Sequence, residues 1–288
     1  MGYKSILVHA CEAQAAESRY RLAADIALAE QARLVGAAMS GVREFMLRYA
    51  SAAAIAPLGL GDLAFMTENA EAELAAFVRS VRARGVIDVH TRLSEDSAAS
   101  ALPLAARYCD LLLIGQTISP DALIADARTL ARHLLVYAPC PVLVAPAVST
   151  SGRTNTSNHA GNGLPKHALI AWDGSMEASR AVRAALPLLQ RAATVAALSF
   201  QPYKYVADGD GLGDALADYL ACHGIDVEVM APTPSEDVGR DLLALAEARG
   251  ADLIVMGSYS HSRFREIVLG GATRTVLAEA TVPVLMAH

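Results

Sequence analysis

The chain has 288 residues, which suits two domains of modest size that can each bury a core. Hydrophobic residues make up 53% of the chain and aromatic residues 5%, a balance typical of helices packed on a sheet. The net charge of −6, without a dense run of lysine or arginine, argues against binding to nucleic acid. Since neither a bilayer-spanning apolar run nor a signal-peptide pattern is found, we expect a cytoplasmic protein without a membrane span.

The first predicted element is a short apolar strand that contains His9 and leads to Cys11, and a helical segment follows it. His9 and Cys11 are two residues apart and so share a face of the strand. A nucleophilic Cys/His pair is one interpretation, but a packed thiol and a buried histidine are favoured. The four cysteines have no C-x-x-C spacing, so we expect buried thiols rather than disulfides or metal ligands.

An extra segment follows at about residues 40–69, rich in Ala, Leu, Met and Phe. Phe45, Met46 and Tyr49 fall on one face of a predicted helix. A helix that caps the sheet edge is the favoured interpretation. The alternative is a lid over an apolar ligand cavity or a groove for a partner.

The chain is duplicated. The segment that begins at Cys109 aligns without a gap with the segment that begins at Ala251, at an offset of 142 residues, and places Gly115 on Gly257. The openings of the two copies align at an offset of 162, so the first copy holds about 20 extra residues. Residues 148–165 are rich in Ser, Thr, Asn and Gly and read as a flexible linker. We therefore predict a first domain at 1–147 and a second at 166–288.

The second copy alternates strands and helices. Its predicted strands are 168–172, 194–199, 226–230, 252–257 and 283–286, and its predicted helices are 176–190, 213–223, 235–248 and 266–278. Nearly continuous apolar strands indicate a sheet covered on both faces. The α/β repeat predicts two tandem, doubly wound, open parallel sheets. Ligands of such sheets bind beyond the carboxyl ends of the strands, where the strand order reverses.

The sequence resembles the universal stress protein family in its tandem form. The resemblance covers both copies, and it rests on "ALIAWDGSMEASRAVRAAL", "ADLIVMGS" and "TVPVLMAH" in the second. It implies five parallel strands per copy in the order 3-2-1-4-5, frequent dimers, and either ATP binding or a nucleotide-free state. In family members that bind nucleotide, a loop carries G, two residues, G, nine residues, then G followed by Ser or Thr.

The resemblance implies a nucleotide site in the second copy. Gly257 matches the first glycine of the loop and Gly270 the third, whereas Ser260 replaces the second glycine and Gly271 replaces the Ser/Thr. Asp173 matches the acidic residue that lines the nucleoside pocket. Backbone amides near the start of a helix favour anions, and arginine suits phosphate. The complete set of candidate nucleotide-binding residues is Asp173, Gly257, Ser258, Ser260, Arg263, Gly270, Gly271, Ala272 and Thr273.

The first copy departs further from the pattern. Of the loop glycines, Gly115 survives, while Ile118 and Arg128 stand at the positions of the other two, and Cys11 stands in place of Asp173. A branched side chain and a long cation replace residues that would admit phosphate. We expect this copy not to bind ATP in the family's manner.

The function expected is that of a stress-response regulator that binds ATP, with Mg²⁺ accompanying it, in the second domain. One alternative is a nucleotide-free module that binds a protein partner or an apolar ligand through the segment at 40–69. A weaker alternative is a slow ATPase; no catalytic residues are assigned. The last strand of each copy is a predicted sheet edge that invites pairing. Pairing of these edges within one chain would give a pseudo-dimeric monomer, and a homodimer is the other arrangement considered.

Overall fold

The computed structural model describes residues 2–11, 16–50, 60–116, 125–147, 163–199, 211–231, 237–258 and 269–288. These residues pack as two compact units. The first unit holds the described residues of 2–115 and 125–140, and the second holds Gln116 and the described residues of 141–288. Across these ranges, no helix is both long enough and apolar enough to cross a membrane.

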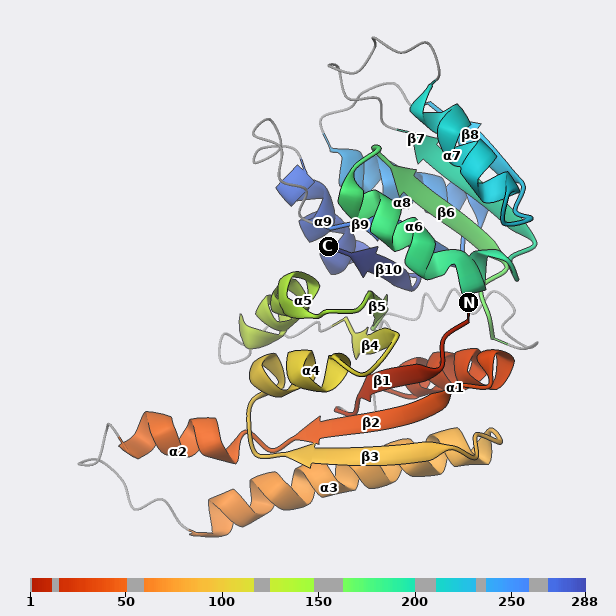
Figure 1. Ribbon diagram of the computed structural model, residues 1–288. Helices are drawn as coiled ribbons and strands as arrows, with labels where there is room; N and C mark the ends of the chain where they lie inside the picture. The colour runs from red at the N-terminus through yellow and green to blue at the C-terminus, as the bar shows by residue number, and fades with distance from the viewer. Residues whose placement is uncertain are drawn as a thin grey trace. The chain divides into compact units, whose positions relative to one another are not determined.

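The first unit is built on four parallel strands in the order β3-β2-β1-β4 (Figure 1). Its elements are β1 (Ser5–His9), α1 (Glu17–Glu30), β2 (Arg33–Met39), α2 (Val42–Ala50), α3 (Leu60–Ala83), β3 (Val89–Ser94), α4 (Ala98–Ala106), β4 (Leu111–Gly115) and α5 (Ala125–Tyr137). Helix α1 packs on α3, and α4 packs on α5. The central strands β1 and β4 are almost wholly buried because both of their faces are apolar and covered by helices.

The extra segment forms α2 and the beginning of α3, with residues 51–59 outside the described part. The second half of α3 is fixed by Phe77, which is fully buried and whose ring lies where a side chain on Gly36 of β2 would stand. Tyr20 of α1 meets the Phe77 ring edge-on at 5.3 Å between centroids. The predicted helix is thus present and reaches the sheet through α3.

Several apolar side chains of the extra segment are exposed to solvent. Phe45 is half-buried, whereas Met46 is 52% exposed and Leu47 68% exposed. Phe65 of α3 is also 68% exposed. The side chain of Tyr49 lies outside the described part of the structure. No cavity beneath these helices is described, so the predicted lid stays a hypothesis.

The second unit repeats the design with all five strands of its own copy. Its elements are β6 (His167–Trp172), α6 (Met176–Leu189), β7 (Thr194–Ser199), α7 (Leu212–Ala221), β8 (Val227–Met230), α8 (Val238–Arg249), β9 (Leu253–Gly257), α9 (Leu269–Glu279) and β10 (Val284–Ala287). The strands are parallel in the order β8-β7-β6-β9-β10, which confirms the expected order 3-2-1-4-5.

The edge strand β10 does not stay unpaired. The last strand of the first copy, β5 (Val142–Ala145), pairs with β10 in antiparallel fashion and belongs to the second unit. Gln116 secures this junction: its side-chain amide donates to the Leu277 carbonyl at 2.9 Å, and its side-chain oxygen accepts from the Ala147 amide at 3.1 Å. The pairing of the two copies' last strands within one chain is therefore present. Most of the linker, residues 148–162, lies outside the described residues.

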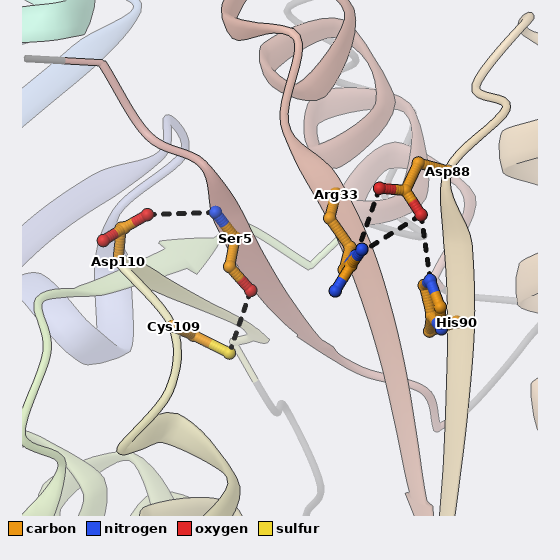
Figure 2. Close-up of polar contacts among 6 residues, drawn as sticks. All are labelled: Ser5, Arg33, Asp88, His90, Cys109 and Asp110. Carbon is orange, nitrogen blue, oxygen red and sulfur yellow. Dashed lines mark hydrogen bonds and ion pairs between the residues drawn. The ribbon is translucent and has the colours of Figure 1, made fainter.

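One aspartate in each unit joins the starts of the first and fourth strands of its copy. In the first unit, the Asp110 carboxylate accepts from the Lys4 amide at 2.7 Å and from the Ser5 amide at 2.9 Å; Figure 2 shows the bond to Ser5. In the second unit, Asp252 accepts from the Lys166 and His167 amides, at distances from 2.7 to 2.9 Å. The duplicated bond fixes the register between these strands at the edge opposite the carboxyl ends.

Removal of either carboxylate should destabilise its own unit. We expect Asp110→Ala and Asp252→Ala each to lower the free energy of unfolding by about 1–2 kcal/mol, because two amides lose a charged acceptor. The measurement is chemical denaturation followed by circular dichroism. Asp226→Ala is the control, since this exposed acid just before β8 has no described hydrogen bond through its carboxylate. Equal stability of Asp252→Ala and the control would contradict the role assigned to the bond.

Candidate functional site

The candidate site lies at the carboxyl ends of β6 and β9, which are parallel neighbours at the centre of the second unit. The chain leaves β6 toward β7 on one side, while β9 and β10 lie on the other side. This is where the strand order reverses, and open α/β sheets bind ligands at such points. Asp173 follows β6 directly and Gly257 ends β9, so the topology brings the two predicted positions to one edge.

Asp173 is held by a tight turn. One of its carboxylate oxygens accepts from the Ser175 amide at 3.0 Å and from the Ser175 hydroxyl at 2.5 Å. The Ser175 oxygen in turn accepts from the Ala178 amide at 3.1 Å and caps α6. Gly174 between them has φ +72°, a backbone conformation that favours glycine. The half-buried carboxylate therefore has a fixed position at the mouth of the site.

Gly257 has a structural reason to be glycine. A β-carbon built on it would lie 2.6 Å from the Ala178 nitrogen and 2.8 Å from the Glu177 carbonyl carbon. Both atoms belong to the backbone of the first turn of α6, which cannot move aside as a side chain could. Close approach of α6 to β9 thus requires this glycine whether or not a ligand binds.

Three of the predicted residues point their side chains away from a ligand. Ser258 is 1% exposed, and its hydroxyl and its amide both donate to the Ala287 carbonyl, at 3.1 and 2.9 Å. Ala272 and Thr273 are buried, and Ala272 lies at the contact between α9 and Gly239 of α8. What these α9 residues can offer to a ligand is backbone N–H. Ser260 and Arg263 lie outside the described residues.

The first turn of α9 is the part of the site that is suited to an anion. The described part of α9 begins at Leu269, and the predicted residues Gly270, Gly271 and Ala272 lie in its first described turn. No atom of the described residues lies within 4 Å of a β-carbon built on Gly271. Because α9 leads back to the amino end of β10, its amino terminus lies at the carboxyl edge of the sheet. Arg274, one turn on, is exposed.

The corresponding place in the first unit is filled by Arg19. This residue is 4% exposed, and its Nη1 atom lies 2.0 Å from where a β-carbon on Gly115 would stand. Its Nη2 atom donates to the Cys11 carbonyl at 2.5 Å. The guanidinium therefore occupies the end of β4. In the second unit, the backbone of α6 occupies the corresponding place at the end of β9.

Arg19 was not among the residues singled out from the sequence. The signal that could have found it is the alignment of the two openings, which places Arg19 on Ala181, a fully buried small residue of α6. The sequence reasoning attributed the loss of the first site to Ile118 and Arg128. Ile118 lies outside the described residues, as does the side chain of Arg128. The described obstruction is Arg19.

A buried histidine lies beside Arg19. His9 is 9% exposed, and burial, followed by the positive charge of Arg19, lowers its pKa to about 3. Its Nδ1 atom is 3.4 Å from the sulfur of Cys11. His9 is thus a neutral hydrogen-bonding group at neutral pH. Among the residues that the structure describes, no group of three or more His, Cys, Asp or Glu could hold a metal ion.

The two loop glycines should respond oppositely to alanine. We expect Gly257→Ala to destabilise the second unit by about 1–3 kcal/mol, because its β-carbon meets helix backbone. Gly271→Ala should be neutral or stabilise by up to about 1 kcal/mol, because its β-carbon meets open space and alanine favours a helix. Thermal unfolding of the two variants against the parent protein measures both effects. A tolerated Gly257→Ala would contradict the close approach of α6.

His9 should make the first unit acid-sensitive. The pKa of His9 is about 3 in the folded chain and about 6.5 in the unfolded chain. Between these values His9 is protonated in the unfolded chain and neutral in the folded chain. The contribution of His9 to stability therefore falls as pH falls, by about 2 kcal/mol between pH 7.5 and pH 5. Unfolding curves across this range measure the slope. In His9→Gln the slope should be smaller, and an unchanged slope would contradict burial of a neutral histidine.

Comparison with known proteins finds a family match for the second copy. The universal stress protein family profile matches residues 165–288. Universal stress protein MJ0577 of Methanocaldococcus jannaschii is 37% identical over 46 residues, which are 16% of this chain and 28% of that protein, so the chain matches only part of this relative.

Solved structures resemble the chain over nearly its whole length. A universal stress protein from Archaeoglobus fulgidus has a TM-score of 0.69 at 16% identity, covering 98% of this chain and 95% of its own. A functionally unknown protein from Pseudomonas aeruginosa has a TM-score of 0.60 at 17% identity, covering 98% and 92%. At these identities the likeness shows the fold. The family profile thus matches the second copy, residues 165–288, and the solved structures show the fold of both copies.

Proposed function

We propose that the second unit binds an adenine nucleotide, ATP with Mg²⁺, and that the protein acts as a ligand-responsive regulator rather than as a catalyst. The observation that carries the proposal is the Asp173 carboxylate, fixed by Ser175 at the carboxyl end of β6 and next to β9, where the strand order reverses. On α9, no atom of the described residues lies within 4 Å of a β-carbon built on Gly271. Amides near the start of a helix favour the negative charge of phosphates.

Each part of the nucleotide has a candidate partner. The Asp173 carboxylate, fixed by Ser175, would accept a hydrogen bond from the nucleoside. The amides of Gly270, Gly271 and Ala272 would donate to phosphate oxygens. Arg263, which precedes α9 in the sequence, would offset phosphate charge, and Mg²⁺ would accompany the phosphates. The arrangement binds and neutralises a nucleotide but places no described general base or nucleophile beside it.

Calorimetric titration with ATP and Mg²⁺ tests the site. Gly270→Arg puts a long side chain at the start of α9, where the first copy has Arg128, and should weaken binding by at least about tenfold, or ~1.4 kcal/mol. Ala278→Arg is the matched control: it adds the same residue to an exposed position near the other end of the helix and should bind as the parent does. Undetectable binding by the parent at millimolar ATP would refute the proposal.

A second candidate function is supported by the exposed apolar side chains of the extra segment. Met46, Leu47 and Phe65 are all more than half exposed, which suits a contact with a protein partner. If ATP does not bind, this nucleotide-free module becomes the better proposal. Phosphate release from ATP in proportion to protein, lost in Gly270→Arg, would instead support slow hydrolysis.

A further inference from the structure

The first unit contains a buried positive charge without a carboxylate partner. Arg19 is 4% exposed, and no ion pair joins it to an acid among the residues that the structure describes. Its Nε atom is buried without a hydrogen-bond partner. A buried guanidinium costs several kcal/mol unless an anion or a full set of acceptors compensates it. Among the described residues, Glu73 of α3 is the carboxylate near this cluster, and it acts on Tyr20 rather than forming an ion pair with Arg19.

Among the described contacts of Arg19, the Cys11 thiol is the group that can supply a negative charge. The Cys11 sulfur lies 3.6 Å from Nη2, while the same nitrogen donates to the Cys11 carbonyl. The Tyr20 ring, whose centroid lies 5.5 Å from the guanidinium carbon, is the other contact, but burial raises the pKa of Tyr20 to about 12. Tyr20 therefore stays neutral, and so does His9. Glu73 of α3 acts electrostatically on Tyr20 and forms no described ion pair with Arg19.

We propose that Cys11 is held as a thiolate by Arg19 and is a modification site for hydrogen peroxide. A nearby arginine favours the thiolate, which is the nucleophilic form of cysteine. Cys11 is half-buried rather than enclosed, so a molecule as small as peroxide can reach it. This inference concerns the first unit and is independent of nucleotide binding in the second.

The reaction balances with peroxide as the oxidant. The thiolate attacks one peroxide oxygen, a sulfur–oxygen bond forms, and the oxygen–oxygen bond breaks. The sulfur loses two electrons and becomes sulfenic acid, and hydroxide leaves and takes a proton to form water. His9, 3.4 Å from the sulfur through Nδ1, is a neutral hydrogen-bonding partner and not an imidazolium counter-ion. Arg19 thus supplies the positive charge.

The other cysteines differ from Cys11 in their surroundings. Burial, with smaller effects from Cys109 and Asp110, raises the pKa of Cys140 to about 12, so Cys140 stays a thiol. Cys109 lies before the start of β4 and accepts a hydrogen bond from Ser5 at 3.5 Å (Figure 2). That is the sheet edge opposite Cys11, so Cys109 is not placed to form a disulfide with it. Cys222, at the end of α7, is exposed and serves as the reference thiol.

Site-resolved alkylation of the native full-length chain tests the proposal. The protein is treated with iodoacetamide from pH 5.5 to 9, and each cysteine is quantified by peptide mass spectrometry. We expect the rate at Cys11 to reach half its plateau at a lower pH than the rate at Cys222, although Cys11 is the less exposed. With peroxide and dimedone at pH 7, the adduct should form at Cys11 first. A higher midpoint for Cys11 than for Cys222, or no adduct at Cys11, would overturn the proposal.

Two substitutions separate charge from packing. Arg19→Met keeps an unbranched side chain but removes the charge, and should shift the Cys11 midpoint upward by about one pH unit, a tenfold loss of rate on the rising limb. Arg19→Lys keeps the charge and should keep most of the reactivity, while Cys222 is unchanged in both. Cys140 must stay unreactive, which reports that the first unit is folded. If Arg19→Met does not fold, the proposal is tested by the pH profiles of Cys11 alkylation in Arg19→Lys and in the parent protein. If Arg19→Met folds and Cys11 is as reactive as in the parent, the proposal is contradicted.

Discussion

The structure of each copy depends on a close contact at the end of its fourth strand. Gly115 and Gly257 occupy this place, and in both cases another part of the chain lies where a β-carbon would be. At Gly257 the backbone of the first turn of α6 lies in this place. At Gly115 it is the guanidinium of Arg19. The same glycine thus permits two different neighbours, and the neighbour determines what the adjacent end of the sheet can hold.

Much of the fold follows from the sequence because its strands carry a strong signal. Short apolar runs place β7 at the predicted residues and the other strands of the second copy within a residue at each end. The division of the extra segment was harder to predict. Its composition favours helix throughout, but only the packing of Phe77 over Gly36 shows that a 24-residue helix reaches from it back to the sheet. Such a contact between distant residues has no local pattern.

The candidate site was predictable to a lesser degree. Asp173 and Gly257 could be placed at one sheet edge because strand order follows from the repeat. The hydroxyl of Ser258 could not be assigned, because its acceptor, the Ala287 carbonyl, lies on a strand 29 residues away. Motif matching also treats Gly257 as a residue for the ligand, whereas the structure gives it a packing role that would exist without one. A glycine match is therefore weaker support for binding than the open space beside Gly271.

The two copies differ most informatively at the aligned positions next to Gly115 and Gly257. The second copy combines an acid, Asp173, with a small buried residue, Ala181, and the backbone of α6 lies against the end of β9. The first copy combines Cys11 with Arg19, which removes the acid and introduces a buried cation. The two residues place a thiol, which can become an anion, against a buried cation. The end of β4 is thus a packed interior whose chemistry differs from that at the end of β9.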